Sequence, residues 1–268
     1  VDPNRYPEKI KNIVLRSRII QLKELVHDGV LATTDAKPVL EVLPAALGYP
    51  DMKRYLTLFQ NDGELRPTGG FMTAYGVLRI DKGRVRAEKS DDIYTLDKKF
   101  NSRLKPPEPI AKYLLSANLK SGIVPYFYLR DMNFSPDFKA SMETFLPNYQ
   151  KIKDEPEVNG VITVDTKVLT DLLTVLGPIE VPGYGKFNLD PDKRCFDIPQ
   201  IICELEYIAD MPIAGTKLAR KDILGPMMQE LILKAMGSPK NVWPKLFETI
   251  LKDIVEKAQK LLVIKQGD

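Results

Sequence analysis

Apolar and polar residues alternate most regularly between Tyr55 and Asp97, and this stretch predicts the centre of a β-sheet. We expect a short apolar strand at Tyr55–Phe59, followed by a polar loop at Gln60–Gly70. The strand after the loop alternates strictly, which is typical of a strand that packs one face on a core. Its two faces are expected to carry Met72, Ala74, Gly76, Leu78 and Ile80 on one side and Thr73, Tyr75 and Arg79 on the other.

The alternating strand ends at Asp81-Lys82-Gly83, which predicts a tight hairpin because Gly83 can adopt a positive φ without a steric penalty. The returning strand closes with the acidic run Ser90-Asp91-Asp92. A hairpin returns the chain to its starting end, so we expect the acidic run beside the polar loop. An arginine, several carboxylates and loop glycines with open backbone amides would converge there. That mixture suits an anion such as phosphate, with or without a divalent metal ion.

Helical spacing of apolar residues predicts two helices before this stretch, at residues 7–28 and at residues 37–47, the second ending at Gly48. We interpret both as packing elements that lead into the sheet. The chain is therefore predicted to have a helical lead-in at residues 1–48 and one α/β domain at residues 49–268.

A strand–helix–strand unit is expected further along the chain. Val158–Val164 has the pattern of a buried strand, Asp165 is placed to cap a helix with one apolar face, and Ile179–Val181 resumes as a strand. Crossovers of this kind build α/β sheets. Two later helices are predicted at residues 217–236 and 239–264, and the apolar stripe of the last one is interpreted as core packing.

Composition limits the chemistry that the chain can perform. The 268 residues are 44% hydrophobic, which is enough for a sizeable core. Thirty-nine basic and 36 acidic residues give a net charge of +3, which is too balanced to indicate nucleic-acid binding, and no basic block is present. No run of about 18 apolar residues that could span a membrane is present.

Histidine and cysteine are scarce: the chain has one histidine, His27, and two cysteines, Cys195 and Cys203. These are too few for a Cys/His metal site, and we interpret His27 as a solvated or core-edge residue. If residues 196–209 form one helix, the cysteines lie about 11 Å apart along it, too far for a disulfide. A break at Pro199 would bring them within reach, and the sequence leaves both arrangements open.

Two further groups of polar residues are candidates for a site. Arg130 and Asp131 precede the cap of a helix that is expected to begin after Ser135, and they could either line a site or form a loop ion pair that fixes the turn. Lys217, Arg220 and Lys221 crowd the first turn of a helix, where cations oppose the helix dipole. That cluster indicates an anionic ligand, because first-turn amides already favour one, or else a solvated charged turn.

Three segments carry a family resemblance. FQNDGELRPTGGF, LRDMNFSPDF and GVITVDTKVLTDLLTVLGPIEVPGY resemble the hallmark segments of the bacterial domain-of-unknown-function family 4012, which occurs downstream of a membrane anchor. The resemblance extends from about Leu43 to the C-terminus. More distantly, the layout resembles the LytR-CpsA-Psr family, whose members transfer glycopolymers from a polyprenyl-pyrophosphate carrier to peptidoglycan outside the cytoplasmic membrane. This likeness implies an α/β/α sandwich with a central mixed sheet and a deep apolar lipid tunnel.

The resemblance also implies roles for individual residues. Arg66 would bind phosphate, whereas Thr68 stands where the LytR-CpsA-Psr family has a metal-binding aspartate. Lys217 and Arg220 keep the charge of the family's late basic motif, although lysine lacks the bidentate fork of arginine. The implied site has Asp91 and Asp92 as catalytic groups; Arg66, Lys217, Arg220 and Lys221 as phosphate ligands; Asp92, Asn61 and Asp62 as Mg²⁺ ligands; and Glu64, Thr68, Arg130 and Asp131 as further polar candidates.

We therefore expect an extracytoplasmic cell-envelope protein that binds a polyprenyl-(pyro)phosphate-linked glycan and, if active, transfers the glycopolymer to a cell-wall acceptor. Mg²⁺ and Arg66 would neutralise the leaving phosphate, and Asp91 would deprotonate the acceptor hydroxyl. The alternative, which Thr68 favours, is a non-catalytic lipid- or glycan-binding module with a degenerate transferase site. In the simplest reading the domain only mediates interactions, and Glu64 and Arg66 pair with each other. An anchor upstream of residue 1 would hold the protein at the outer face of the bacterial membrane, and no nucleic-acid partner is expected.

Overall fold

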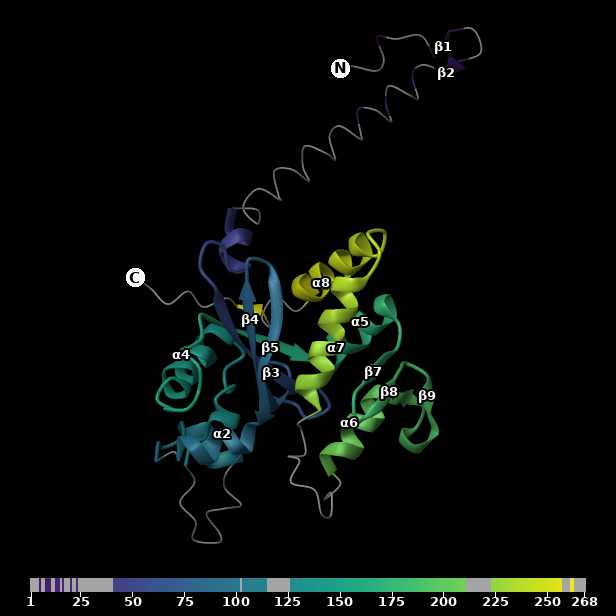
Figure 1. Cartoon of the computed structure of the whole chain (residues 1–268). Coiled ribbons are helices and arrows are strands. Elements are labelled where there is room, and N and C mark those ends of the chain that lie inside the picture. Colours follow the sequence, from purple (N-terminus) through teal and green to yellow (C-terminus); the bar gives the residue numbers. More distant parts are fainter. Residues whose placement is uncertain are drawn as a thin grey trace. The chain divides into compact units, whose positions relative to one another are not determined.

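The computed structural model describes residues 41–101, 103–114, 126–210, 223–256 and 261–262, together with a few residues between Arg5 and Lys23 (Figure 1). The chain divides into two compact units. The first comprises Val1–Met52 with Asp81–Gly83, and the second comprises Lys53–Ile80 with Arg84–Asp268.

In the first unit, β1 (Lys9–Ile10) and β2 (Ile13–Val14) form a short antiparallel pair. The helix predicted for residues 7–28 is therefore wrong at these four positions, whereas the described residues Arg16, Ile20 and Lys23 are helical, as predicted. Most of the other residues of this range lie outside the described part. Three of the four strand residues are β-branched, a side-chain type that fits a strand better than a helix. Residues 41–46 are helical, and the predicted stop at Gly48 is confirmed by its φ of 75°.

The second unit is built on a mixed sheet with the strand order β11-β6-β3-β4-β5. β3 (Lys53–Asn61) pairs antiparallel with β4 (Phe71–Asp81) and parallel with β6 (Gly160–Asp165). β5 (Arg84–Asp92) is one edge strand, and β11 (Leu261–Leu262) lies beyond β6. The predicted α/β class with a central mixed sheet is confirmed at this level.

Helices cover both faces of this sheet (Figure 1). α2 (Ile93–Phe100) and α4 (Phe138–Tyr149) lie on one face, together with the π-helical turn η2 (Ile110–Leu114) and the 3₁₀ turn η3 (Leu129–Asp131). The core on this face joins buried strand residues such as Leu58, Tyr75 and Val161 to buried helix residues such as Leu96 and Phe145.

The second face is covered by helices from the C-terminal half of the chain. These are α5 (Thr166–Leu176), α6 (Gln200–Asp210), α7 (Leu224–Gly237) and α8 (Trp243–Glu256). Between α5 and α6 lie the antiparallel pairs β7 (Ile179–Val181) with β8 (Gly185–Phe187) and β9 (Pro191–Asp192) with β10 (Ile198–Pro199), the latter joined through η4 (Lys193–Cys195). A second core unites Leu173, Ile179, Phe187, Ile201 and Met227.

Burial along β4 differs from the prediction of one packed face. Ala74, Tyr75 and Val77 are all fully buried, because helices cover both sides of the strand. A bulge between Phe59 and Gln60 shifts the register, so Met72 packs in the same core as Tyr75 and Val77 rather than facing away from them. The alternation in this strand therefore separates two buried faces and does not distinguish core from solvent.

Candidate functional site

A cavity of about 320 Å³ lies between the second face of the sheet and helices α5, α6 and α7. Its walls are almost entirely apolar. Strands β3 and β6 contribute Phe59, Ile162 and Val164, and the helices contribute Leu169, Leu172, Leu205, Met228 and Leu231. The volume falls within the range of about 300–1,000 Å³ that is typical of small-molecule sites.

One end of the cavity is polar because of the strand topology. β3 and β6 run parallel, with Gln60 opposite Asp165, so the polar residues at their carboxyl ends lie side by side. Gln60, Asn61, Asp165 and Thr166 all line the cavity. Ligands of α/β sheets bind at such carboxyl ends. Among the described residues, the cavity lining includes no lysine or arginine.

Local hydrogen bonds hold this polar end in place. Asp165 caps α5, and its Oδ1 accepts a hydrogen bond of 3.0 Å from the backbone N–H of Val168. The hydroxyl of Thr166 donates to Asp62 Oδ1, which ties the loop after β3 to the first turn of α5. Asn61 Oδ1 accepts from the backbone N–H of Gly63 at 3.1 Å.

Two side-chain oxygens of the cavity lining have no hydrogen-bond partner. They are Thr57 Oγ1 and Gln60 Oε1, and their residues are only 1% and 3% exposed. The amide nitrogen of Gln60 is occupied, because it donates to Thr68 Oγ1 at 2.7 Å. An unpaired buried oxygen costs about 1–3 kcal/mol, so a bound group that donates a hydrogen bond at this position would recover part of that cost.

Thr68, a predicted site candidate, belongs to a buried network that fixes the polar loop. Its hydroxyl oxygen accepts from Gln60 and, at 3.0 Å, from Asn133 Nδ2. Asn133 also donates to the carbonyl of Gly70 at 2.8 Å, which joins the loop to the segment after η3. A threonine with two hydrogen-bonded neighbours and 3% exposure holds the loop together.

Arg66, the predicted phosphate ligand, does not line the cavity. Its Nη2 donates to Glu64 Oε1 at 3.2 Å, and its guanidinium lies 5.0 Å from the ring centroid of Phe71. The Glu64–Arg66 pair expected from the simplest reading of the loop is therefore present. No hydrogen bond reaches the buried Nε of Arg66.

Arg130 and Asp131 lie in a charged cluster that includes a residue the sequence did not single out, Asp97. Arg130 Nη1 donates to Asp97 Oδ2 at 2.7 Å, and its guanidinium lies 4.9 and 4.6 Å from the ring centroids of Tyr94 and Tyr128. Burial raises the pKa of Asp97 to about 6 despite the neighbouring Arg130. Burial also raises the pKa of Asp131, against the opposing charges of Arg130 and Arg66.

Each arginine of this cluster lies beside a carboxylate. The two arginines, Arg66 and Arg130, are accompanied by the carboxylates of Glu64, Asp97 and Asp131. The charged groups of this cluster come from the polar loop, α2 and η3 and pair with one another.

Asp91 and Asp92, the predicted catalytic pair, have structural partners. Asp92 caps α2 by accepting from the backbone N–H of Tyr94 at 2.8 Å, and Asp91 Oδ1 accepts from the backbone N–H of Asp92 at 2.7 Å. Asp92 ends β5, two strands away from β3, whereas Asp62 bonds to α5 on the other face. The structure therefore does not bring Asp92 together with Asn61 and Asp62. Within the described ranges, no three Asp, Glu, His or Cys side chains are placed to hold a metal ion.

The predicted cationic turn of Lys217, Arg220 and Lys221 lies outside the described residues. The helix expected there at residues 217–236 is seen from Leu224 onward as α7.

Glu155 forms a buried cross-link that sequence reasoning missed. Its side chain is fully buried and accepts hydrogen bonds from Lys89 Nζ and Lys99 Nζ at 2.7 Å and from the hydroxyl of Tyr75 at 3.0 Å. Burial opposes ionisation of Glu155, but the bonds from both lysines outweigh it, and its pKa is lowered. No local pattern marks Glu155, because its partners are 56 to 80 residues away.

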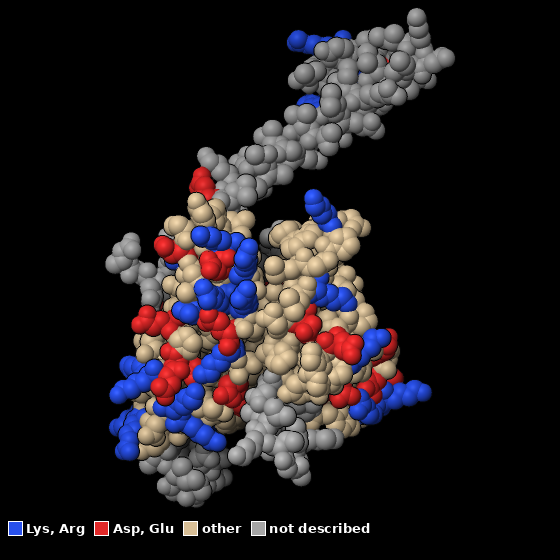
Figure 2. All heavy atoms as spheres, in the orientation of Figure 1, with Lys and Arg blue, Asp and Glu red and all other residues tan. Residues whose placement is uncertain are grey.

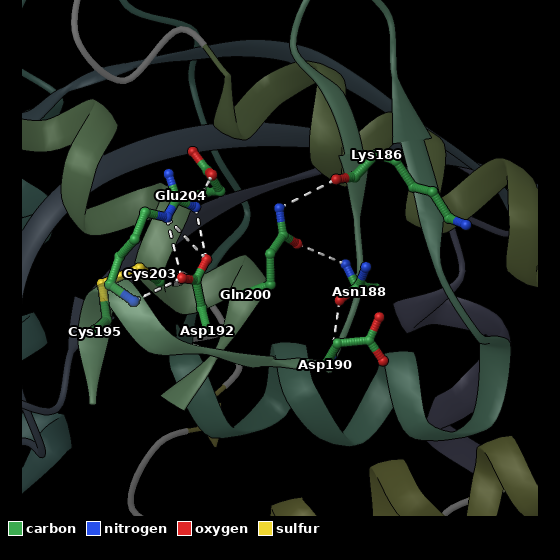
Figure 3. A network of polar contacts seen from close by, with 9 residues as sticks. Lys186, Asn188, Asp190, Asp192, Cys195, Gln200, Cys203 and Glu204 are labelled. Carbon is green, nitrogen blue, oxygen red and sulfur yellow. Dashed lines mark hydrogen bonds and ion pairs between the residues drawn. A yellow bond between two sulfur atoms is a disulfide. The ribbon is translucent and has the colours of Figure 1, made fainter. Parts of the chain in front are cut away.

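The two cysteines form a disulfide, with their Cα atoms 5.7 Å apart (Figure 3). The sequence left this pairing open, and the structure explains it: α6 begins at Gln200, directly after Pro199, so the cysteines do not share a helix. Polar bonds reinforce the link. Arg194 donates to Asp192 at 2.6 Å and also to Glu204, while Gln200 joins the backbone of Asn188 to that of Lys186 (Figure 3).

Comparison with known proteins identifies the family to which this chain belongs. Residues 51–193 match the model of DUF4012, a family described as a protein of unknown function. A solved structure, that of the Lin1025 protein from Listeria innocua, matches 78% of this chain and 77% of its own at 13% identity, with a TM-score of 0.37. No protein with a curated description matches. In the part of the chain that the structure describes, we find no helix of the length and apolarity needed to cross a membrane.

Proposed function

The chain belongs to the DUF4012 family, and from its geometry we propose an extracytoplasmic cell-envelope protein that binds a polyprenyl-(pyro)phosphate-linked glycan without turning it over. The observation that carries this proposal is the apolar cavity between the sheet and α5, α6 and α7. The isoprenoid chain would occupy the cavity, and the polar head would lie at the carboxyl ends of β3 and β6.

The apolar lining of the cavity supports a hydrocarbon ligand. α5, α6 and α7 contribute aliphatic and methionine side chains to its wall, and the strands add Phe59, Ile162 and Val164. Each buried methylene contributes about 0.8 kcal/mol of transfer free energy, so even a short isoprenoid chain would supply a large part of the binding free energy. The finer likeness to the LytR-CpsA-Psr fold, an α/β/α sandwich with a lipid tunnel, is part of this proposal.

Binding without transfer is the reading that the site residues favour. Asp91 and Asp92 are engaged in the cap and first turn of α2, and neither lines the cavity. The predicted Mg²⁺ ligands do not fit a single ion, because Asp92 lies two strands from the others. We therefore derive no phosphoryl-transfer step through them.

The disulfide supports the proposed location. Disulfides form and persist in oxidising compartments outside the cytoplasm and are rare within it. The Cys195–Cys203 bond closes the segment between β9 and α6, where polar bonds also hold the chain. An extracytoplasmic position at the cell envelope accounts for such a bond.

The proposal is tested by native mass spectrometry of the chain with farnesyl phosphate as a short probe. Leu172 lines the cavity, so Leu172→Trp should fill it and weaken binding at least tenfold. Thr174→Trp is the matched control, because Thr174 is exposed on the same helix and should leave binding unchanged. Failure of the wild-type protein to bind, or equal binding by Leu172→Trp, would overturn the proposal.

A further inference from the structure

The hydroxyl group of Thr57 lies in the floor of the cavity, on β3. Thr57 lines the cavity and is 1% exposed, and among the described residues its Oγ1 has no hydrogen-bond partner. Side chains alternate along the strand, so Thr57 shares the cavity face with Phe59, whereas Leu56 and Leu58 pack in the core on the opposite face. The unpaired hydroxyl is therefore on the face of the strand that a ligand in the cavity would contact.

The neighbours of Thr57 on this face are apolar. In the sheet, Thr57 is paired with Gly76 of β4 and with Ile162 of β6. A Cβ atom at Gly76 would lie 3.2 Å from Met228 Cε and 3.4 Å from Phe59 Cε2, so these two side chains lie against Gly76, beside Thr57. A buried water molecule needs two to four polar partners, and these neighbours add no polar side chain to the hydroxyl of Thr57. This part of the floor is thus poorly suited to hold water.

The strand itself does not need a hydroxyl at this position. Valine has nearly the same shape as threonine and is also favoured in strands, and it would leave no oxygen without a partner. A buried oxygen that lacks a hydrogen bond destabilises the folded state. The hydroxyl of Thr57 becomes useful when a ligand supplies the missing hydrogen bond.

The chemistry of the cavity indicates which ligand group this is. A threonine hydroxyl can donate one hydrogen bond and accept others, and a hydroxyl group on the ligand can do the same. Among the described residues, the lining has no lysine or arginine but includes Asp165 and Glu206. Figure 2 shows charged residues crowding the outer surface over β4 and β5. A buried anion without a paired cation is costly, so a neutral hydroxyl suits this lining.

We propose that the cavity binds a neutral lipid alcohol whose hydroxyl group is hydrogen-bonded to Thr57 Oγ1. The hydrocarbon chain of the alcohol would contact the apolar lining. Thr57 precedes Gln60 by three residues, which places it about 10 Å along the strand from the polar end of the cavity. This inference goes beyond the proposed function, because a free lipid alcohol carries neither a phosphate nor a glycan, and its hydroxyl would lie away from the polar end.

Equilibrium dialysis of the chain with two probes tests the proposal. One probe is farnesol, the other is the hydrocarbon with a hydrogen atom in place of its hydroxyl, and gas chromatography measures the bound amount of each. Thr57→Val should weaken farnesol binding about tenfold and leave hydrocarbon binding within about twofold, because only the alcohol loses a hydrogen bond. Thr57→Ser keeps a hydroxyl at this position and should keep farnesol affinity within about threefold.

Thr73→Val is the matched control. Thr73 also lines the cavity, but its hydroxyl already donates to the backbone carbonyl of Phe59 at 3.4 Å. This change should leave the ratio of farnesol affinity to hydrocarbon affinity as it is in the wild type. Leu172→Trp should weaken the binding of both probes about tenfold or more, because the indole would occupy the space that they share.

The outcomes separate this inference from the proposed function. No farnesol binding by the wild type, or an equal loss of farnesol and hydrocarbon in Thr57→Val, would overturn the inference. Farnesyl phosphate, with its head at the polar end, should bind Thr57→Val as it binds the wild type, and a loss equal to that of farnesol would also overturn it. Farnesol binding that depends on Thr57, with no binding of farnesyl phosphate, would overturn only the proposed function.

Discussion

Replacing Glu155 by glutamine tests the buried cross-link that joins β4, β5 and α2. Glutamine keeps the shape of the side chain but removes the charge that faces Lys89 and Lys99. Losing one partner of a buried ion pair costs about 3–5 kcal/mol, because the remaining charges are left uncompensated. Here the lysine side chains are 27% and 34% exposed, so water screens part of that cost. We expect a loss of about 2–3 kcal/mol in the free energy of unfolding.

Chemical denaturation followed by circular dichroism measures this loss, and the midpoint of thermal unfolding should fall by about 4–12 °C for a domain of this size. Glu157→Gln is the control, since Glu157 is exposed two residues away and its change should stay within about 0.5 kcal/mol. The cross-link also predicts a pH dependence. The pKa of Glu155 is lowered in the folded state, so its stabilisation is complete above the ordinary value of 4.5 and is lost as the pH falls through the folded value. A difference of less than about 1 kcal/mol in the free energy of unfolding between wild type and variant would refute this reasoning, and so would a difference that is the same at pH 7 and pH 3.

Three further predictions address the polar groups around the cavity and the loop. The pKa of Asp97 is raised from 3.8 to about 6, so the wild type should lose stability relative to Asp97→Asn as the pH rises between these values. Chemical denaturation across this pH range measures the difference, and a difference that does not change with pH would contradict the prediction. Thr57→Val removes an unpaired oxygen from the cavity wall and should raise the free energy of unfolding of the ligand-free protein by about 1 kcal/mol. Arg66→Ala should leave farnesyl phosphate affinity within about twofold, because Arg66 lies outside the cavity lining; a large loss would place the phosphate site at the polar loop.

The local parts of the fold could be predicted from sequence, because short-range patterns encode them. The alternating strand β4, the turn at Gly83 and the capped helix after Asp165 each depend on residues within a few positions of one another. The prediction that the polar loop and the acidic run lie at the same end of the sheet followed from the hairpin alone. These features needed no knowledge of distant contacts.

The cavity could not be predicted in the same way. Leu169, Leu172 and Leu231 look identical in sequence to residues that fill a core, and only the spacing of three helices above the sheet leaves room between them. The opposite error occurred on α8, where Phe247 and Ile250 have the pattern of core residues but are exposed. In both cases the apolar pattern predicted which residues share one face of the helix. Whether that face packs in a core, lines a cavity or is exposed depends on the arrangement of the neighbouring elements.

The parallel pairing of β3 with β6 has a consequence for how the ligand site comes into being. Arg54 bonds through its backbone to Asn159, 105 residues later, at the start of this pairing. Contacts between such distant residues require closure of a long loop, whereas the β3–β4–β5 meander forms from neighbours in sequence. We therefore expect the meander to fold first and the cavity to appear only when β6, α5 and the later helices dock on it. A chain emerging during synthesis would have three of the five strands of this sheet before the cavity existed.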